Sequence, residues 1–206
     1  ALLHCDGVQA FGKMPINLSD MGVDLFSASG HKIHGPKGIG ILYIKKGVTV
    51  KPLITGGGQE RGMRSGTESV PLIYGLAGAV DELGNISQNL KRQKDLWLYA
   101  KNTLLDTGFV TINSADEVLP YILNISVEGY RSETLLHFLE AQGVYVSSGS
   151  ACSKGKDSHV LGEMGLNPRR VDSALRISFS RYNTKEDIDI LKSALIQATQ
   201  RLRKAN

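Results

Sequence analysis

The stretch Ser27-Ala28-Ser29-Gly30-His31-Lys32-Ile33-His34-Gly35-Pro36-Lys37-Gly38 carries a lysine between an apolar run and a glycine-rich turn. The run at 23–26 is typical of a buried strand, so Lys32 is expected just after a strand end. A lysine held in a small-residue loop can attack a carbonyl carbon and form a Schiff base, which is how enzymes tether pyridoxal phosphate (PLP). A solvated lysine in a surface loop is the alternative interpretation.

The composition is that of a globular protein with a real core. The 206 residues are 41% hydrophobic and 21% charged, enough for one large domain or two small ones. The net charge of +4 is mild, and the basic clusters at 91–94 and 201–204 are interpreted as solvated helix faces. We therefore expect no nucleic-acid partner. No apolar run approaches the roughly 18 residues of a membrane span, so no membrane association is expected either.

The two cysteines predict different roles. Cys5 lies in an apolar run and is expected to be structural, whereas Cys152 lies in a loop of Ser, Gly, Ala and Lys. A partly exposed thiol near positive charge, here Lys154, favours a reactive group. Neither cysteine forms a C-x-x-C pair, so zinc chemistry and a disulfide scaffold are not expected. This usage favours a reducing compartment, the cytoplasm.

The first part of the chain places polar residues at strand ends. The run 2–5 predicts a buried strand that ends at Asp6, and runs 23–28 and 38–44 predict two more. Ligands of open α/β sheets bind at the carboxyl ends of strands, so Asp6 is expected to face a cofactor unless it is only a turn residue. The segment 56–67 has the glycines, hydroxyls and guanidinium groups to cradle an anion, or is simply a flexible turn.

The second part predicts helices and an α+β lobe. Apolar residues recur at helical spacing over 67–106, weakened at Gly84-Asn85, and strand-like and helical segments alternate beyond this stretch. Arg176 interrupts the apolar strand 174–178. A buried guanidinium needs an anion, which is either an internal carboxylate or the carboxylate of a substrate.

Several motifs, in this order along the chain, resemble those of the cysteine desulfurases. These are PLP-dependent enzymes of fold type I, related to class V aminotransferases, and the resemblance is to the housekeeping class that serves iron–sulfur cluster assembly. The segment ending at Ser180-Arg181 around Arg176 is similar to a further family block. The other matching motifs are Asp6-Gly7-Val8-Gln9, Ser29-Gly30-His31-Lys32 with Gly35-Pro36-Lys37-Gly38, the segment 56–67, and Ser148-Gly149-Ser150-Ala151-Cys152.

The resemblance implies an α/β fold in two parts. Residues 1–86 would be the C-terminal part of a PLP-binding large domain, with a mixed, mostly parallel sheet and its connecting helix. Residues 87–206 would be a smaller α+β domain that carries the Cys152 loop. The implied activity is removal of sulfur from L-cysteine, giving L-alanine and a persulfide on Cys152.

The resemblance also implies the cofactor-binding residues. Lys32 would form the Schiff base with PLP and, with His31, take part in catalysis. Asp6 would pair with the pyridinium nitrogen, and Gln9 would hydrogen-bond the phenolic oxygen of the ring. Ser29 and His31 would bind the phosphate.

Three further roles follow from the same resemblance. Thr67 would reach the phosphate of the other subunit in a homodimer, Arg176 would hold the substrate carboxylate, and Cys152 would be the nucleophile. The persulfide sulfur would pass to an acceptor protein, such as an iron–sulfur scaffold. No metal site is implied.

Alternatives to a desulfurase stay open at this point. A selenocysteine lyase or another class V PLP enzyme would share the cofactor residues, and a truncated sulfur-relay scaffold would need none of them. The family carries about half of its length ahead of the position of Asp6, so the chain resembles a C-terminal half. With 206 residues alone, we expect weak PLP binding and little activity.

Overall fold

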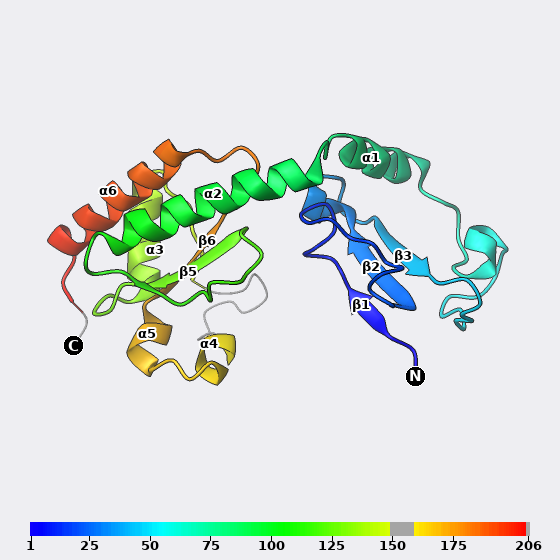
Figure 1. The fold of residues 1–206 in the computed structure, drawn as a ribbon, viewed down its shortest axis with the longest axis horizontal. Coiled ribbons are helices and arrows are strands. Elements are labelled where there is room, and N and C mark those ends of the chain that lie inside the picture. The colour runs from blue at the N-terminus through cyan, green and yellow to red at the C-terminus, as the bar shows by residue number, and fades with distance from the viewer. Residues whose placement is uncertain (149–158, 205–206) are drawn as a thin grey trace. The chain divides into compact units, whose positions relative to one another are not determined.

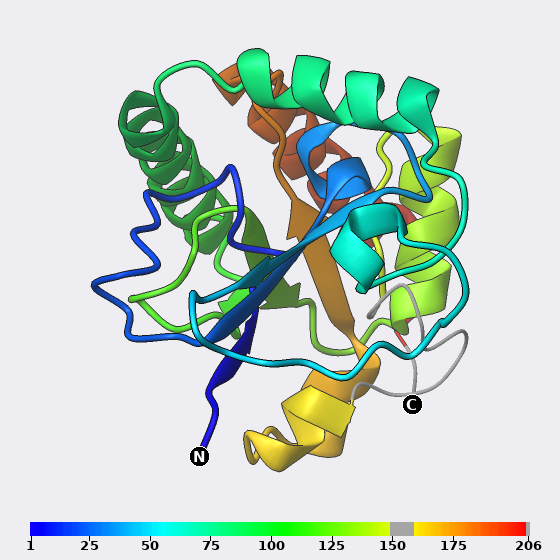
Figure 2. The ribbon, with the colours of Figure 1, turned by 90° about the vertical axis from the view of Figure 1, so that its right-hand side faces the viewer.

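The computed structural model describes residues 1–148 and 159–204 and divides the chain into two compact units, unit 1 (1–90) and unit 2 (91–206). Unit 1 contains a three-stranded sheet in the order β1 (His4–Asp6), β2 (Leu25–Ser29), β3 (Gly40–Ile44). These strands face the viewer in Figure 2. β1 is parallel to β2 and β3 is antiparallel to it, so the sheet is mixed, as expected.

Two one-turn 3-10 helices and an α-helix complete unit 1. They are η1 (Gly30–Ile33), η2 (Gln59–Gly62) and α1 (Val70–Asp81). η1 starts directly after β2, so the turn that contains Lys32 is fixed to the end of a central strand. Val23, Phe26 and Ala28 are the buried core of the sheet, with Cys5, Phe11, Ile16, Leu18 and Tyr43 packed against them.

The helical stretch expected over 67–106 is two helices, because the interruption at 82–85 is complete. α1 ends at Asp81, and α2 (Ile86–Leu105) begins after Gly84, which has a left-handed φ of 59°. A helix cannot continue through that conformation. The side-chain oxygen of Asn85 accepts a hydrogen bond from the Gln88 N–H at 3.0 Å and so caps the start of α2.

Unit 2 is built on an antiparallel sheet in the order β4–β5–β6 (Figure 1). The α+β architecture agrees with the expected class. The segment expected as a strand at 144–147 contributes only a single bridge, between Ser147 and Arg176. The elements are β4 (Thr111–Ile112), β5 (Ile122–Ser126), α3 (Ser132–Ala141), α4 (His159–Glu163), α5 (Pro168–Asp172), β6 (Ala174–Ser178) and α6 (Lys185–Arg201).

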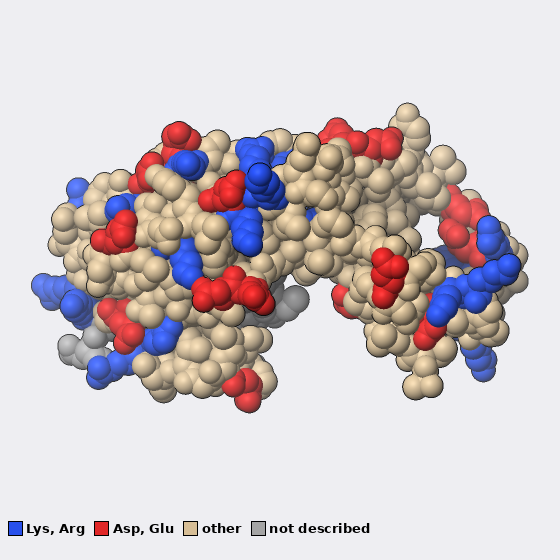
Figure 3. Space-filling model, in the orientation of Figure 1, with Lys and Arg blue, Asp and Glu red and all other residues tan. Residues whose placement is uncertain are grey.

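One large hydrophobic core holds unit 2 together. Nineteen buried residues of the described part, drawn from α2, α3, α6, the strands β5 and β6 and the loops beside them, form a single cluster. The Trp97 indole N–H donates to the Ile122 carbonyl at 2.9 Å, which ties α2 to β5. On the face drawn in Figure 3, the acidic and basic side chains of the described residues are interspersed. No helix among the described residues is long and apolar enough to cross a membrane.

Candidate active site

The candidate site of unit 1 begins where two parallel strands end. β1 ends at Asp6 and β2 ends at Ser29, and the register pairs Asp6 with Ser27. Because the strands run the same way, their carboxyl ends lie at one edge of the sheet, where α/β proteins bind ligands. The structure therefore brings Asp6 to the same sheet edge as Ser29 and the turn that follows it.

The Asp6-Gly7 turn is fixed by hydrogen bonds and by the absence of a side chain at Gly7. The Val8 N–H donates to Asp6 Oδ1 at 2.9 Å, and the Gly7 N–H donates to the Ser27 carbonyl at 2.8 Å. A Cβ added at Gly7 would lie 1.8 Å from the Phe26 ring. Glycine is therefore required here for the turn to pack on the core of unit 1 while leaving the Asp6 carboxylate exposed.

Hydrogen-bonded turns over 8–13 carry Gln9. The Phe11 N–H donates to the Gly7 carbonyl at 2.8 Å, and the Lys13 N–H donates to the Ala10 carbonyl at 3.0 Å. Gln9 and Lys13 are four residues apart, and the left-handed Gly12 between them means that this segment is not a continuous helix. The Lys13 ammonium donates to Gln9 Oε1 at 3.0 Å. Sequence reasoning missed Lys13, although its i, i+4 spacing from Gln9 was visible.

The turn after β2 holds His31 and Lys32. Ser29 Oγ and His31 Nδ1 are 2.7 Å apart and share a hydrogen bond. Ile33 is 3% exposed and anchors η1 in the unit, whereas Lys32 is half-buried and His31 is exposed. The structure thus places a hydroxyl, an imidazole and a primary amine within four consecutive residues.

The turn closes through His34, whose backbone is strained. Its φ is 67°, in the left-handed region that favours glycine, and its N–H donates to the Gly30 carbonyl. The Gly35 N–H donates to the same carbonyl at 2.9 Å. Left-handed backbone at a residue other than glycine costs about 1 kcal/mol and is enriched at functional sites.

These groups fit the chemistry of PLP. A carboxylate such as Asp6 keeps a pyridine nitrogen protonated, an amine such as Lys32 can bond to a carbonyl, and hydroxyl and imidazole groups can donate to phosphate. All three kinds of group lie along the ends of β1 and β2. Among the described residues, no cluster of three or more His, Cys, Asp or Glu could hold a metal ion.

The glycine-rich segment 56–67 is organised by its own hydrogen bonds. Ser65, 7% exposed, donates its hydroxyl to the Gly57 carbonyl at 2.8 Å, and Gln59 Oε1 accepts from the Gly66 N–H at 3.2 Å. Arg64 donates to the neighbouring Ser65 carbonyl at 2.6 Å. Thr67, the last residue of this segment, is exposed, and no hydrogen bond among the described residues joins it to Ser29 or Lys32. Its expected role toward another subunit stays a prediction.

Arg176 belongs to unit 2, on β6. It lies opposite Asn124 on β5, and its backbone N–H donates to the Ser147 carbonyl at 2.6 Å. Its side-chain Nε is buried and has no hydrogen-bond partner in the described part of the chain. Within residues 1–148 and 159–204, no ion pair joins Arg176 to a carboxylate. Within the described residues the internal pairing that the sequence also allowed is not seen, and the role of Arg176 toward a substrate stays a prediction.

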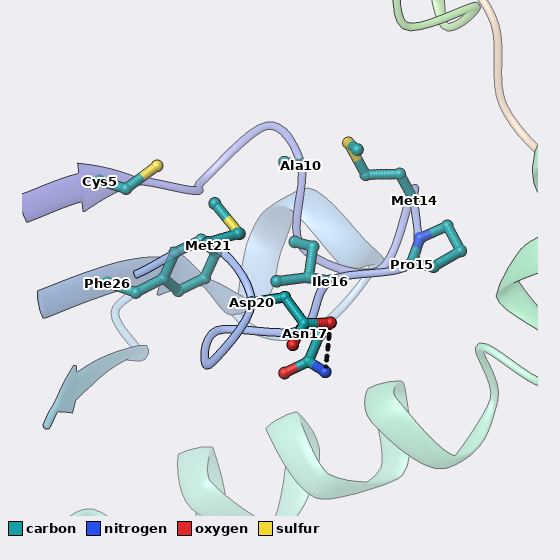
Figure 4. Close-up of a pocket in the computed structure, with 9 residues that line it drawn as sticks. All are labelled: Cys5, Ala10, Met14, Pro15, Ile16, Asn17, Asp20, Met21 and Phe26. Carbon is teal, nitrogen blue, oxygen red and sulfur yellow. Dashed lines mark hydrogen bonds between the residues drawn. The ribbon is translucent and has the colours of Figure 1, made fainter. Parts of the chain in front are cut away.

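Of the two cysteines, the structure describes one. Cys152, the expected nucleophile, lies outside the described residues. Cys5 is a half-buried free thiol beside the core of unit 1, and it borders a cavity of about 560 Å³ (Figure 4). None of the expected site residues lines this cavity, whose walls are Cys5, Ala10, Met14, Pro15, Ile16, Asn17, Asp20, Met21 and Phe26.

A family model described as "Aminotransferase class-V" matches residues 1–191, so the chain belongs to the class-V aminotransferase family. It is similar to a cysteine desulfurase of Trichormus azollae, with 41% identity over 98% of this chain and 52% of the relative. The chain spans about half the length of the curated relatives that it matches. The resemblance seen in the sequence is thereby confirmed.

Solved structures agree with the fold. A "NifS-like protein" superposes with a TM-score of 0.84 at 41% identity, over 97% of this chain and 53% of that one. A structure described as SspA in complex with cysteine gives a TM-score of 0.69 at 33% identity, over 89% of this chain and 51% of that one. The expected fold class, part of a fold-type I transferase, is confirmed by these neighbours.

Proposed function

We propose that this chain forms part of a PLP-dependent cysteine desulfurase, which takes sulfur from L-cysteine and leaves L-alanine and a persulfide on Cys152. The observation that carries the proposal is the placement of Asp6, Ser29, His31 and Lys32 at one edge of the unit 1 sheet. Relatives of similar sequence are named cysteine desulfurases, and one similar structure holds cysteine, which supports this substrate.

The cofactor half of the site is assigned to unit 1. PLP, when bound, would supply an electron sink next to the substrate carbon. Asp6 holds the ring nitrogen in its protonated form, and Gln9 donates its amide N–H to the phenolic oxygen. Ser29 and His31, already joined at 2.7 Å, donate to the phosphate. Lys32 would hold the cofactor through its amine and would move protons at the substrate carbon.

The two residues proposed to act on the substrate belong to unit 2. Arg176 binds the substrate carboxylate with the guanidinium whose Nε has no partner among the described residues. The Cys152 thiolate would attack the substrate sulfur and keep it as a persulfide, while the electron pair of the broken carbon–sulfur bond stays with the substrate carbon, which takes up a proton and becomes the methyl group of L-alanine. A protein acceptor, such as an iron–sulfur scaffold, then takes this sulfur.

The same proposal includes the wider organisation of the protein. Residues 1–86 belong to the C-terminal part of a PLP-binding large domain, and residues 87–206 to a small domain. In a homodimer, Thr67 donates to the phosphate bound by the other subunit. A cytoplasmic location suits this chemistry, because the Cys152 thiol must stay reduced between turnovers.

The test uses the complete natural protein with PLP. We expect an absorbance band at about 390–420 nm that Lys32→Ala abolishes, because the band requires the lysine amine to bond the cofactor carbonyl. Lys37→Ala is the matched control, since Lys37 is exposed in the same turn and should leave the band intact. Cys152→Ala should keep the band but lose alanine release from L-cysteine. Full alanine release by Cys152→Ala would refute the desulfurase assignment.

A further inference from the structure

Lys13 makes a specific contact with the candidate cofactor site. Its ammonium donates to Gln9 Oε1 at 3.0 Å across one turn of the segment 7–14. Gln9 itself is exposed, so its amide is free to rotate unless a neighbour holds it. The pair lies immediately beyond Asp6, whose carboxylate ends β1.

The backbone around Gly12 brings Lys13 close to Lys32. Gly12 has a left-handed φ of 72°, and a Cβ added there would lie 2.7 Å from Ile33 Cγ2. Ile33 directly follows Lys32 in η1, so the two segments pass within contact of each other. Partial burial, and then the charge of Lys32, lower the pKa of Lys13. Lys13 is therefore held beside the expected cofactor anchor rather than in open solvent.

The chemistry of the two side chains fixes the orientation of the Gln9 amide. An ammonium group has three donors and no acceptor, so the amide atom that faces Lys13 must be the oxygen. The amide NH₂ is then directed away from Lys13 and is available to donate. If the amide rotated by half a turn, its oxygen would meet the phenolic oxygen of the cofactor, and two acceptors repel each other.

We propose that Lys13 is a positioning residue, which holds Gln9 so that the amide NH₂ donates to the ring oxygen of PLP. The inference rests on the proposed function, because it assigns a role within the same cofactor site. Lys13 does not touch the reacting atoms in this proposal. It acts only through Gln9, and this makes the two residues energetically coupled.

The experiment is a double-mutant cycle on PLP binding by the complete natural protein. Lys13→Met keeps the aliphatic stem but removes the donors. We expect it to raise the PLP dissociation constant about 10-fold, the size of one charge-assisted hydrogen bond. In a Gln9→Ala background, Lys13→Met should change the dissociation constant less than about 2-fold, because the residue it positions is gone.

Two controls separate positioning from folding and charge. Lys46→Met removes the same charge from an exposed site of unit 1 and should bind PLP like the wild type. Lys13→Arg keeps N–H donors and should retain most of the affinity, even if the methionine variant folds poorly. The absorbance maximum of bound PLP is a second readout, and it should move equally in Lys13→Met and Gln9→Ala.

The outcomes distinguish this inference from the function on which it rests. A wild-type protein that gives no Lys32-dependent band would overturn both. A normal band combined with wild-type affinity in Lys13→Met would overturn the positioning role alone. Equal weakening of PLP binding by Lys13→Met in the wild-type and Gln9→Ala backgrounds would also overturn the positioning role, because Lys13 would then act independently of Gln9.

Discussion

Unit 2 is organised by a large apolar core, whereas the site of unit 1 is organised by backbone contacts. Nineteen buried residues form one cluster in unit 2, and three form the corresponding cluster in the sheet of unit 1. In unit 1, Leu2, Leu3 and Leu42 are each more than half exposed. The residues around Asp6 and Lys32 are instead fixed by short hydrogen bonds and by glycines that let chain segments touch.

This difference suggests which substitutions each unit tolerates. In a core, the cost of a change depends on the apolar volume that is lost. In a site built from closely approaching backbone, the cost depends on the volume that is added. A substitution to alanine can therefore leave a cavity in the core of unit 2 and add too much volume at a glycine of unit 1.

The largest effect is expected from Leu135→Ala in unit 2. Leu135 lies on α3 and is fully buried, so its truncation should lower the free energy of unfolding by about 3 kcal/mol. Urea unfolding followed by the fluorescence of Trp97, the only tryptophan, measures unit 2 specifically. Leu98→Ala, at a site that is 41% exposed, is the control and should cost less than about 1 kcal/mol.

The same substitution, followed by hydrogen exchange, tests whether the stability of unit 1 depends on the core of unit 2. Hydrogen exchange of the amides that pair β1 with β2 reports on unit 1. We expect Leu135→Ala to leave that exchange unchanged. Faster exchange in β1 and β2 would show that the core of unit 2 also stabilises unit 1, and would break the comparison.

The next effect is expected from Gly7→Ala in unit 1. The added methyl group would overlap the Phe26 ring, and overpacking of this kind costs about 1–3 kcal/mol. Hydrogen exchange at β1 should accelerate about 5- to 150-fold, because 1.4 kcal/mol corresponds to about a factor of ten. PLP binding should weaken with it, since the turn carries Asp6.

Gly78→Ala is the matched control for this substitution. Gly78 lies on α1, and an added Cβ there meets no atom within 4 Å. Alanine should stabilise the helix by up to about 1 kcal/mol, because glycine loses more backbone entropy on folding. Unaltered exchange at β1 in Gly7→Ala would contradict the view that glycine contacts hold the site.

Much of the architecture could be predicted from the sequence, because apolar runs indicate strands and glycines indicate turns. The runs at 23–28 and 38–44 predicted two strands, which the structure places at Leu25–Ser29 and Gly40–Ile44. The mixed sheet and the α+β character of unit 2 also agree. The full break at 82–85 was missed, because a glycine in a helical pattern shows its left-handed φ only in the structure.

The site was predictable in its residue types but not in its contacts. Asp6 and Lys32 were expected from their positions after strand-like runs, and Ser29 and His31 from the family resemblance; the register of β1 on β2 gives them a common edge. The contact of Lys13 with Gln9 depends on the turns over 8–13, where the left-handed Gly12 leaves no periodic pattern to detect. The contact of Gly12 with Ile33 joins segments about twenty residues apart, which no local pattern reports.

The smallest effect is expected from removing the charge of Asp24, whose carboxylate contacts Leu3 and Lys45 and so links residues next to the three strands of unit 1. Asp24 Oδ2 accepts from the Leu3 N–H at 2.9 Å, and Lys45 Nζ lies 3.6 Å from Asp24 Oδ1. That hydrogen bond, and then the Lys45 charge, lower the pKa of Asp24 below the ordinary 3.8. A lowered pKa in the folded state means that the charged carboxylate favours folding.

The sign of the pH dependence follows from this shift. The stabilisation by Asp24 is fully present above about pH 4, the unfolded pKa, and is lost as the pH falls through the lower pKa of the folded state. Asp24→Asn keeps an oxygen that can accept from Leu3 but removes the charge. Above pH 4, the variant should therefore exchange its β1 and β2 amides slightly faster than the wild type, with the difference shrinking below that pH.

Glu68→Gln is the control for this last change, because it removes the same charge from an exposed residue of unit 1 that no ion pair within the described residues involves. Exposed ion pairs contribute little, so the effect should be far smaller than that of Gly7→Ala. If Asp24→Asn accelerated exchange as much as Gly7→Ala, charge rather than close backbone approach would hold β1 against β2. The contrast between the two units would then lie in electrostatics instead of in packing.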